Sequence, residues 1–437
     1  MSYRKAEALN GSRLTCQSAA RKRRTAPGTL CLLLAAVILA GCGGSRGGGQ
    51  AQGPQTVTPP AQAEPILLPP ILPDPGVAGP QFDDGRIRIA LLAPLSGREA
   101  AAGQALQNAA ELALFDAADE NFLLRPYDTA GDAQRAEQAV QQAIAEGADL
   151  ILGPLFSAAT TAIAPYARAA QVPVISFSND EVVAGDGVYV LGFLPRDQVD
   201  RVVRYAEVQG ITKYATLAPS TPYGRSVAAA LQDSTRAHGV ETVKVTFYDP
   251  TTPDLSPIVK QFSEQERRER QQRLDDLPYQ AILLPEGGTR LRALAPMLAY
   301  YDIDHRQIRL LGTAQWDAGD VATEPSLGGG WYAAPGEESR IAFERRFRDA
   351  FGSTPPVIAG LAYDATALAA ILAREGKIGG FSAARLTADD GFAGVNGIFR
   401  LRANGLNERG LAVYEIDNGT KRVIDPAPQS FAPPLIN

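Results

Sequence analysis

The stretch that decides the fold is ADLILGPLFSAATTAIAPYARAAQVPVISFSND, which covers residues 148–180. It predicts a short buried strand over 149–152, a Gly-Pro turn, a helix from about Ser157, and a second strand over 172–177. Two strands joined by a helix within roughly thirty residues form a βαβ unit, in which the strands are parallel. The stretch therefore predicts an α/β fold.

Polar side chains follow both strands of this unit. Ser157 and Thr160 come after the first strand, and Ser178 and Asp180 come after the second. Because small molecules bind at the carboxyl ends of strands in open α/β sheets, we expect these residues to line a ligand site. The start of the helix suits an anion such as an α-carboxylate, although Ser157 would equally serve as an ordinary helix cap with no ligand.

The remaining sequence predicts two series of strands and helices, which indicate two Rossmann-like lobes. The first series begins with the buried strand RIRIALLAP, and Ser96 lies in the turn after it. In the second series, Tyr223 lies in a turn and Glu286 directly follows a strand, so both could face a ligand. Trp316 is expected to be exposed, because its loop is polar.

These patterns also give the expected boundaries of the domains. A helix near 358–374 has few strands beside it in the sequence, so the chain should cross between the lobes more than once. The charged segment 256–276 predicts a single solvated helix. We expect a two-lobed domain over 86–425 and a loose tail over 426–437, with lobe 1 at about 86–205 plus part of 335–400, and lobe 2 at about 210–335 plus the C-terminal strands.

The N-terminus reads as a targeting segment. Four basic residues at 21–24 precede a short apolar run over 30–39, which favours a cleaved signal over a membrane-spanning helix. The run ends in Leu-Ala-Gly-Cys, which resembles the bacterial lipobox and implies a lipid on Cys42 after removal of residues 1–41. Residues 42–85 are rich in Gly and Pro and predict a disordered tether. Gly43 rather than Asp follows the cysteine, which resembles the enterobacterial sorting pattern for delivery to the periplasmic face of the outer membrane.

Composition argues against several classes of function. The net charge of −6 offers no basic field for nucleic acid. The two histidines, His238 and His305, are far apart in the sequence and have no cysteine near them, so neither a metal nor a cofactor is expected. No motif of a nucleophilic hydrolase or of a nucleotide-binding loop occurs. Paired carboxylates of a hydrolase are not excluded by counting, but no spacing indicates them, and we expect no enzymatic activity.

Three segments together resemble type I periplasmic-binding proteins of the Leu/Ile/Val-binding branch: RIRIALLAPLSG, the stretch quoted above, and PYG at 222–224. The resemblance implies two lobes with parallel sheets, joined by a three-crossover hinge. It also implies that Ser157 binds the carboxylate of an amino acid, that Ser178 offers backbone contacts, and that Tyr223 belongs to the cleft. Asp180 stands where these proteins carry a threonine, and Glu286 is a loose match for the acid that holds the ammonium group.

A narrower resemblance covers the lipobox, the Pro-rich tether and the segment LAPMLAYYDIDHRQIRLLGTAQWD. These look like penicillin-binding protein activators, which are outer-membrane lipoproteins that contact a peptidoglycan synthase. The resemblance implies a lipid-anchored regulator of cell-wall synthesis, attached to the membrane only through its N-terminal lipid. The alternative is the substrate-binding protein of a branched-chain amino acid type ABC transporter, with an amino-acid-like ligand in its cleft.

Overall fold

The computed structural model describes residues 84–273, 276–317, 319–374 and 380–431. The expected signal segment, Cys42 and nearly all of the expected tether lie outside these ranges.

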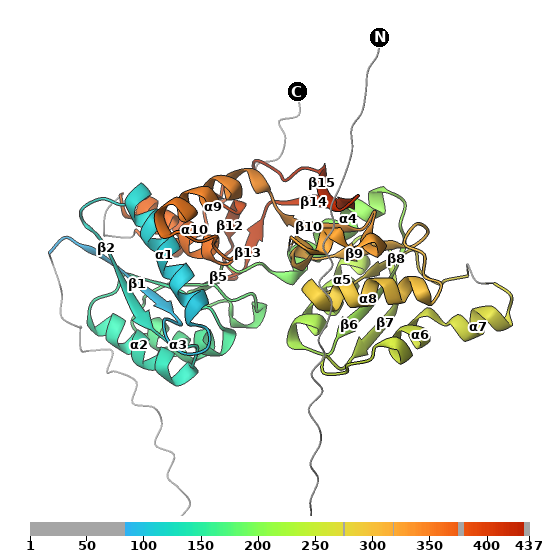
Figure 1. Cartoon of the computed structure of the whole chain (residues 1–437). Coiled ribbons are helices and arrows are strands. Elements are labelled where there is room, and N and C mark those ends of the chain that lie inside the picture. Colours follow the sequence, from blue (N-terminus) through green and yellow to red (C-terminus); the bar gives the residue numbers. More distant parts are fainter. Residues whose placement is uncertain (1–83, 274–275, 318, 375–379, 432–437) are drawn as a thin grey trace, which may run out of the picture. The chain divides into compact units, whose positions relative to one another are not determined.

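The first lobe is built on a five-stranded sheet with the strand order β2-β1-β3-β4-β5. Figure 1 labels its strands β1, β2 and β5. Every neighbouring pair in it is parallel, and the interior strand β1 is buried along its whole length, as expected for a strand covered on both faces. The strands are β1 (Ile87–Ala93), β2 (Phe122–Asp128), β3 (Leu150–Leu152), β4 (Val174–Ser176) and β5 (Val188–Val190).

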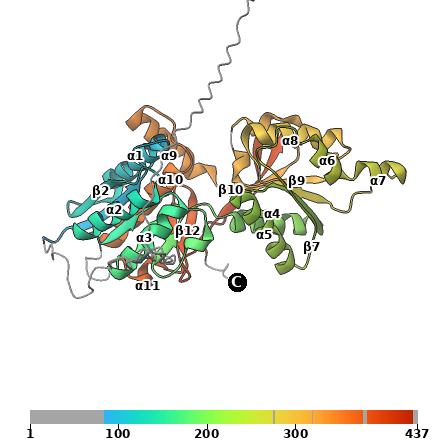
Figure 2. The ribbon, with the colours of Figure 1, turned by 90° about the horizontal axis from the view of Figure 1, so that it is seen from below.

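Helices cover both faces of this sheet (Figure 1, Figure 2). Helices α1 (Ala100–Ala117) and α10 (Ala359–Ala373) pack against one face, with α9 (Glu337–Phe351) beside them. Helices α2 (Ala133–Ala145) and α3 (Ser157–Ala169) cover the other face. Since α10 lies among α1, the sheet and later elements of the lobe, it is apolar around most of its circumference.

The C-terminal part of the first lobe adds small elements. A three-stranded antiparallel sheet consists of β11 (Phe392–Gly394), β12 (Gly397–Leu401) and β13 (Asn407–Arg409). Phe399 and Leu401 of this sheet join the same core as α1 and α10. Two further short helices are η1 (Glu181–Val183), which links β4 to β5, and α11 (Ala383–Leu386).

The second lobe has a seven-stranded sheet with the order β15-β14-β10-β9-β8-β6-β7. Strands β6 to β10 are parallel, β14 pairs antiparallel with β10, and β15 pairs antiparallel with β14. The strands are β6 (Lys213–Pro219), β7 (Glu241–Tyr248), β8 (Ala281–Leu283), β9 (Arg309–Gly312), β10 (Trp331–Pro335), β14 (Leu411–Asp417) and β15 (Thr420–Asp425).

Helices also cover both faces of the second sheet. Helices α4 (Pro195–Val208) and α5 (Pro222–Ala237) share one core with it, and α6 (Ser256–Ser263) and α8 (Gly288–Tyr300) share the other. The remaining helical segments are α7 (Gln265–Arg270), η2 (Ala314–Asp317), η3 (Val321–Thr323) and η4 (Pro325–Leu327).

The chain passes between the two lobes three times. It crosses from β5 into α4, from β10 into α9, and from β13 into β14. Side chains join the first and third crossings: Nδ2 of Asn407 donates to the carbonyl oxygens of Val190 and Gly192, at 2.8 and 2.9 Å. Nη2 of Arg409 donates to the carbonyl oxygen of Leu191 at 3.1 Å.

Four expectations from the sequence differ from the structure. Lobe 1 does not extend to residue 205, because α4 packs its apolar side in the core of the second lobe. The charged segment 256–276 is two helices, since Glu264 adopts a left-handed conformation that ends α6. The tail is not loose where it is described, because the Arg400 guanidinium lies over the Phe431 ring, 4.4 Å from the centroid of that ring.

The fourth difference concerns Trp316, which is buried with only 1% of its surface exposed. Its indole Nε1 donates to the carbonyl oxygen of Leu284 at 3.2 Å. The ring occupies the space where a side chain at Gly312 would stand, since a Cβ there would lie 2.2 Å from it. The polar loop around Trp316 therefore covers the core of the second lobe.

Candidate functional site

The predicted site residues of the first lobe lie after the carboxyl ends of its strands. Ser96 follows β1, and its Oγ donates to the Asp128 carboxylate, which ends β2, at 2.5 Å. The Arg135 guanidinium lies 3.8 Å from the same carboxylate. Hydrogen bonds from Ser96 and nearby backbone amides hold the pKa of Asp128 below its usual range despite partial burial. Ser96 thus belongs to a charged cluster at the end of β2.

Three of the predicted residues form a continuous hydrogen-bonded chain with Ser176. The hydroxyls of Thr160 and Ser176 lie 2.8 Å apart, and both side chains are buried. Ser176 Oγ accepts from the backbone N–H of Ser178, whose own Oγ accepts from the backbone N–H of Asp180 at 3.1 Å. The carboxylate of Asp180 accepts from the backbone N–H of Val182 and so caps η1. The chain fixes the loop after β4 against the first turn of α3.

Ser157 stands at the start of α3, but it does not cap the helix. The capping position is Phe156, and no side chain there accepts a bond from the helix, so Ser157 is the first helical residue. The turn before it is tight: Gly153 has a φ of +85°, and a Cβ on it would lie 2.2 Å from the carbonyl oxygen of Leu92. The half-buried Ser157 hydroxyl and the first N–H groups of α3 can therefore bind an anionic group.

In the second lobe, Tyr223 lies in the first turn of α5. Its hydroxyl donates to Oγ1 of Thr313, which follows β9, at 3.0 Å. Burial raises the pKa of Tyr223 to about 12, so the phenol remains protonated at neutral pH. Because its one proton is donated to Thr313, the hydroxyl oxygen is left as an acceptor for a polar ligand.

Glu286 follows β8 and accepts a hydrogen bond from the hydroxyl of Tyr248, at the end of β7. Burial, with the neighbouring Glu286 carboxylate, raises the pKa of Tyr248. The guanidinium of Arg290 lies 5.5 Å from the Tyr248 ring centroid. Beside burial, the charge of the Glu286 carboxylate also contributes to the raised pKa of Tyr223, so the two predicted residues of this lobe interact electrostatically.

The structure therefore gathers the predicted residues into three groups. Thr160, Ser178 and Asp180 form one group near Ser157; Ser96 stands in a second with Asp128; and Tyr223 and Glu286 belong to the third. The sequence also placed Ser176 in the polar cluster after the second strand of the βαβ unit, but sequence reasoning missed the other partners that position these residues, which are Thr313, Tyr248, Arg135 and Arg290. Thr313 could have been found, because it is a hydroxyl residue directly after a buried strand.

A polar groove of about 430 Å³ continues from the charged cluster along β2 and α2. Arg125 on its wall pairs with Glu146 at 2.7 Å, and Glu146 also accepts from the hydroxyl of Tyr127 at 2.8 Å. The lining residues are Arg125, Pro126, Tyr127, Asp128, Arg135, Gln138, Ala139, Gln142 and Glu146. Its charges are thus already paired within the protein.

Within the described ranges, no three His, Cys, Asp or Glu side chains group closely enough to hold a metal ion. No helix in the described part of the chain has the length and apolar character needed to cross a membrane.

Comparison with known proteins identifies the family. The sequence profile described as "Periplasmic binding protein" matches residues 86–421, which is most of the chain. The chain therefore belongs to the periplasmic binding protein family. Membership implies a periplasmic location, and proteins of this family are in general binding proteins rather than enzymes.

Solved structures support the type I fold. A putative branched-chain amino acid ABC transporter protein from Rhodospirillum rubrum matches with a TM-score of 0.65 and 19% identity, covering 78% of this chain and 100% of that one. A branched-chain amino acid transporter substrate-binding protein from Streptococcus pneumoniae, in complex with isoleucine, matches with a TM-score of 0.56 and 19% identity. The match covers 78% of this chain and 100% of that one. A solute-binding protein from Rhodopseudomonas palustris, in complex with 3,4-dihydroxybenzoic acid, matches with a TM-score of 0.57 and 18% identity. The match covers 79% of this chain and 97% of that one.

Two curated relatives match over a smaller part of the chain. An uncharacterized protein of Rickettsia prowazekii is 25% identical over 231 residues, which are 53% of this chain and 61% of that protein. An uncharacterized protein of Methanocaldococcus jannaschii is 25% identical over 191 residues, which are 40% and 46% of the two chains. The chain thus spans less than two thirds of either relative.

Proposed function

We propose that the protein is a periplasmic receptor for a small ligand that carries a carboxylate, as does the substrate-binding protein of a branched-chain amino acid type transporter. The observation that carries this proposal is the start of α3, where the Ser157 hydroxyl and free helix N–H groups stand beside the fixed loop of Ser178 and Asp180. Two structurally similar proteins hold isoleucine and 3,4-dihydroxybenzoic acid, and both ligands carry a carboxylate.

The groups around this site would divide the work of recognition. The start of α3 would hold the carboxylate. Asp180, whose carboxylate is half-buried, would attract an ammonium group, and Tyr223 would contact the remainder of the ligand. An amino acid uses all three groups, whereas a benzoate leaves Asp180 without a cation.

Ligand-dependent thermal unfolding tests the proposal. Branched-chain amino acids and hydroxybenzoates are added separately, and one class is expected to raise the melting temperature; about 100-fold excess over Kd adds ~2.7 kcal/mol to the free energy of unfolding. Ser157→Ala and Asp180→Asn should remove that shift for an amino acid, while Asp180→Asn should leave a benzoate shift unchanged. Glu338→Gln, on the exposed start of α9, is the matched control. The absence of any shift with every carboxylate tested would refute the proposal.

A second candidate is a lipid-anchored regulator of the penicillin-binding protein activator type, which would contact a peptidoglycan synthase. The observation that favours it is Tyr300, in the segment that resembles those activators, whose side chain is 77% exposed and meets Tyr301 edge to face. Exposed aromatic residues are typical of protein contact sites. The lipid on Cys42 and the outer-membrane location belong to this proposal and lie outside the described residues.

Capture from membranes tests this second candidate. The full-length protein should retain a bifunctional synthase, and Tyr300→Ala should reduce the amount retained, whereas Ile371→Ala, an exposed apolar residue of the first lobe, should not. Cys42→Ala should release the protein from the membrane, and mass spectrometry of the mature protein should show acyl chains on Cys42. A mature protein without acyl chains, or one that retains no synthase, would exclude this function.

A further inference from the structure

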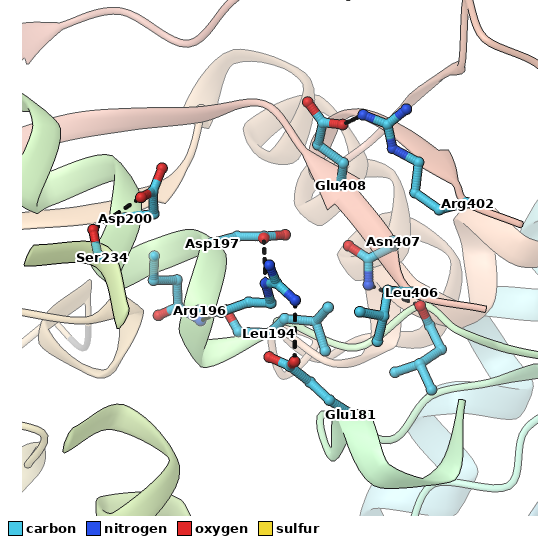
Figure 3. Close-up of polar contacts among 12 residues, drawn as sticks. Glu181, Leu194, Arg196, Asp197, Asp200, Ser234, Arg402, Leu406, Asn407 and Glu408 are labelled. Atoms are coloured by element: carbon cyan, nitrogen blue, oxygen red, sulfur yellow. Dashed lines mark hydrogen bonds and ion pairs between the residues drawn. The ribbon is translucent and has the colours of Figure 1, made fainter. Parts of the chain in front are cut away.

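The first turn of α4 lies at the junction of the two lobes, directly after the first crossing of the chain. Arg196 of this turn pairs with Glu181 of η1, with 3.4 Å between Nη1 and Oε2 (Figure 3). Glu181 belongs to the first lobe, whereas α4 packs in the core of the second. This ion pair therefore joins the lobes beside the crossing.

The next residue, Asp197, carries an uncompensated carboxylate oxygen. Its Oδ2 is buried and has no hydrogen-bond partner among the described residues, and the side chain as a whole is 21% exposed. The nearest cation is Nε of Arg196, 4.0 Å from Oδ1. A buried charge without hydrogen bonds is costly, so this group has a strong reason to become neutral or to reach water.

Charged groups of the first lobe surround Asp197. Glu181 of η1 and Glu408 of β13 (Figure 3) repel its negative charge. Arg409 of β13 attracts it. Glu408 is itself paired with Arg400 and Arg402.

The attraction from Arg409 is shared with another carboxylate. Nη1 of Arg409 lies 3.8 Å from Oδ2 of Asp364, and both side chains are fully buried. One buried guanidinium thus interacts with an acid of the first lobe and attracts an acid of the second, so it cannot neutralise both.

We propose that Asp197 couples the arrangement of the two lobes to pH. When Asp197 is protonated, it is neutral, so the acids of the first lobe do not repel it and it can occupy the buried position shown in Figure 3. When it ionises, repulsion from Glu181 and Glu408 and the need for water favour a rotation about the crossings that moves the start of α4 away from the first lobe. If ionised Asp197 has a lower free energy in one lobe arrangement than in the other, a change in pH shifts the equilibrium between the two arrangements.

Asp197 gains and loses its proton near neutral pH. Burial is the largest cause, and together with the acidic neighbours it raises the pKa of Asp197 to about 7. A change from pH 6 to pH 8 therefore crosses the titration of this group, whereas an ordinary aspartate is ionised throughout that range.

Single-molecule energy transfer between the lobes tests this inference without any ligand, so its outcome is independent of the proposed function. The full chain carries dyes at Gln134→Cys on α2 and Gln232→Cys on α5, both exposed, with the three native cysteines replaced by serine. We expect the ratio of two inter-lobe distance populations to change by about threefold or more between pH 6 and pH 8, with the longer distance favoured at pH 8.

The variant Asp197→Asn, which mimics the protonated acid, should keep the low-pH distribution at both pH values. Asp200→Asn, one turn further along α4, is the matched control and should respond to pH like the parent chain. Glu408→Gln should weaken the response, because it removes one of the repelling charges. The inference is overturned if the parent chain shows no pH response, or if Asp197→Asn responds as strongly as the parent chain.

Discussion

At the scale of single residues, Asp197 has a consequence for stability that is separate from lobe movement. Its pKa is raised in the folded protein to about 7, so the folded chain binds more protons than the unfolded chain between the two pKa values. The stabilising effect of that bound proton is complete below the unfolded pKa, near 4, and is lost as the pH rises through 7. Ionised Asp197 therefore destabilises the fold above neutral pH.

We predict that Asp197→Asn raises the free energy of unfolding above pH 7, by on the order of 2–4 kcal/mol. The gain should shrink as the pH falls and vanish near pH 4, because aspartate and asparagine are then both uncharged. Urea denaturation at a series of pH values measures the difference. A gain of the same size at pH 4 and pH 8 would show that titration of Asp197 is not its cause.

The sequence could predict which polar residues follow a strand, but it could not predict which side chains are buried. Ser178 and Asp180 follow a buried strand, so their places in the loop could be predicted. Nothing in the sequence marks Asp197 as unusual, because acids in the first turn of a helix are common. Trp316 was placed wrongly, because the glycine that makes room for its ring stands four residues earlier in a strand.

At the scale of elements, α7 shows how a charged helix is attached to the fold. Arg268 is fully buried although its neighbours in the sequence are charged and mostly exposed. Its Nε donates to the carbonyl oxygen of Ser263, and its two terminal nitrogens donate to the carbonyl oxygens of Asp302 and Tyr301, at 3.2 and 3.0 Å. The turn after α8 is thereby joined to the start of α7.

We predict that Arg268→Ala lowers the free energy of unfolding by about 1–3 kcal/mol, since it leaves the buried carbonyl group of Ser263 and the partly buried ones of Tyr301 and Asp302 without this donor. Hydrogen exchange should rise in α7 and in the turn at 301–302 more than elsewhere in the second lobe. Arg270→Ala, on an exposed side of the same helix, should change the free energy of unfolding by less than about 0.5 kcal/mol. Equal effects of the two substitutions would mean that Arg268 does not anchor α7.

The elements that the sequence predicted are those with long apolar patterns. Strands β1 and β6 and helices α1 and α10 bury continuous or periodic apolar residues, which sequence reasoning detects. Strands β13 and β15 are short or rich in charge, and they pair because neighbouring strands place them, so the sequence did not indicate them. The break at Glu264 also lacks a signal, since neither glycine nor proline stands there.

At the scale of the whole molecule, the buried pair of Arg409 and Asp364 holds the crossings in place. Arg409 donates to backbone oxygens of Leu191 and Asn396, so it joins the first crossing to the small sheet of the first lobe. Asp364 on α10 accepts from the backbone N–H of Val395 at 2.6 Å. Burial is the main cause that raises the pKa of Asp364 to about 6.

We predict that Arg409→Gln lowers the free energy of unfolding by about 3–5 kcal/mol at pH 8, because it leaves a buried carboxylate without its cation. The double variant Arg409→Gln/Asp364→Asn should lose less than the single variant, since the uncompensated charge is then gone. Calorimetry of both variants at pH 8 measures this. A double variant less stable than Arg409→Gln would show that the backbone bonds of Arg409, and not the charge pair, dominate.

The packing of α10 against α1 has a consequence for how the protein is made. Helix α1 lies near the beginning of the described chain and α10 near its end, and they share one apolar core. The first lobe cannot complete that core until the ribosome has synthesised residues beyond 373, after the whole parallel part of the second sheet. A nascent chain of this kind stays incompletely folded while it is synthesised, which suits passage through a secretion channel before folding is finished.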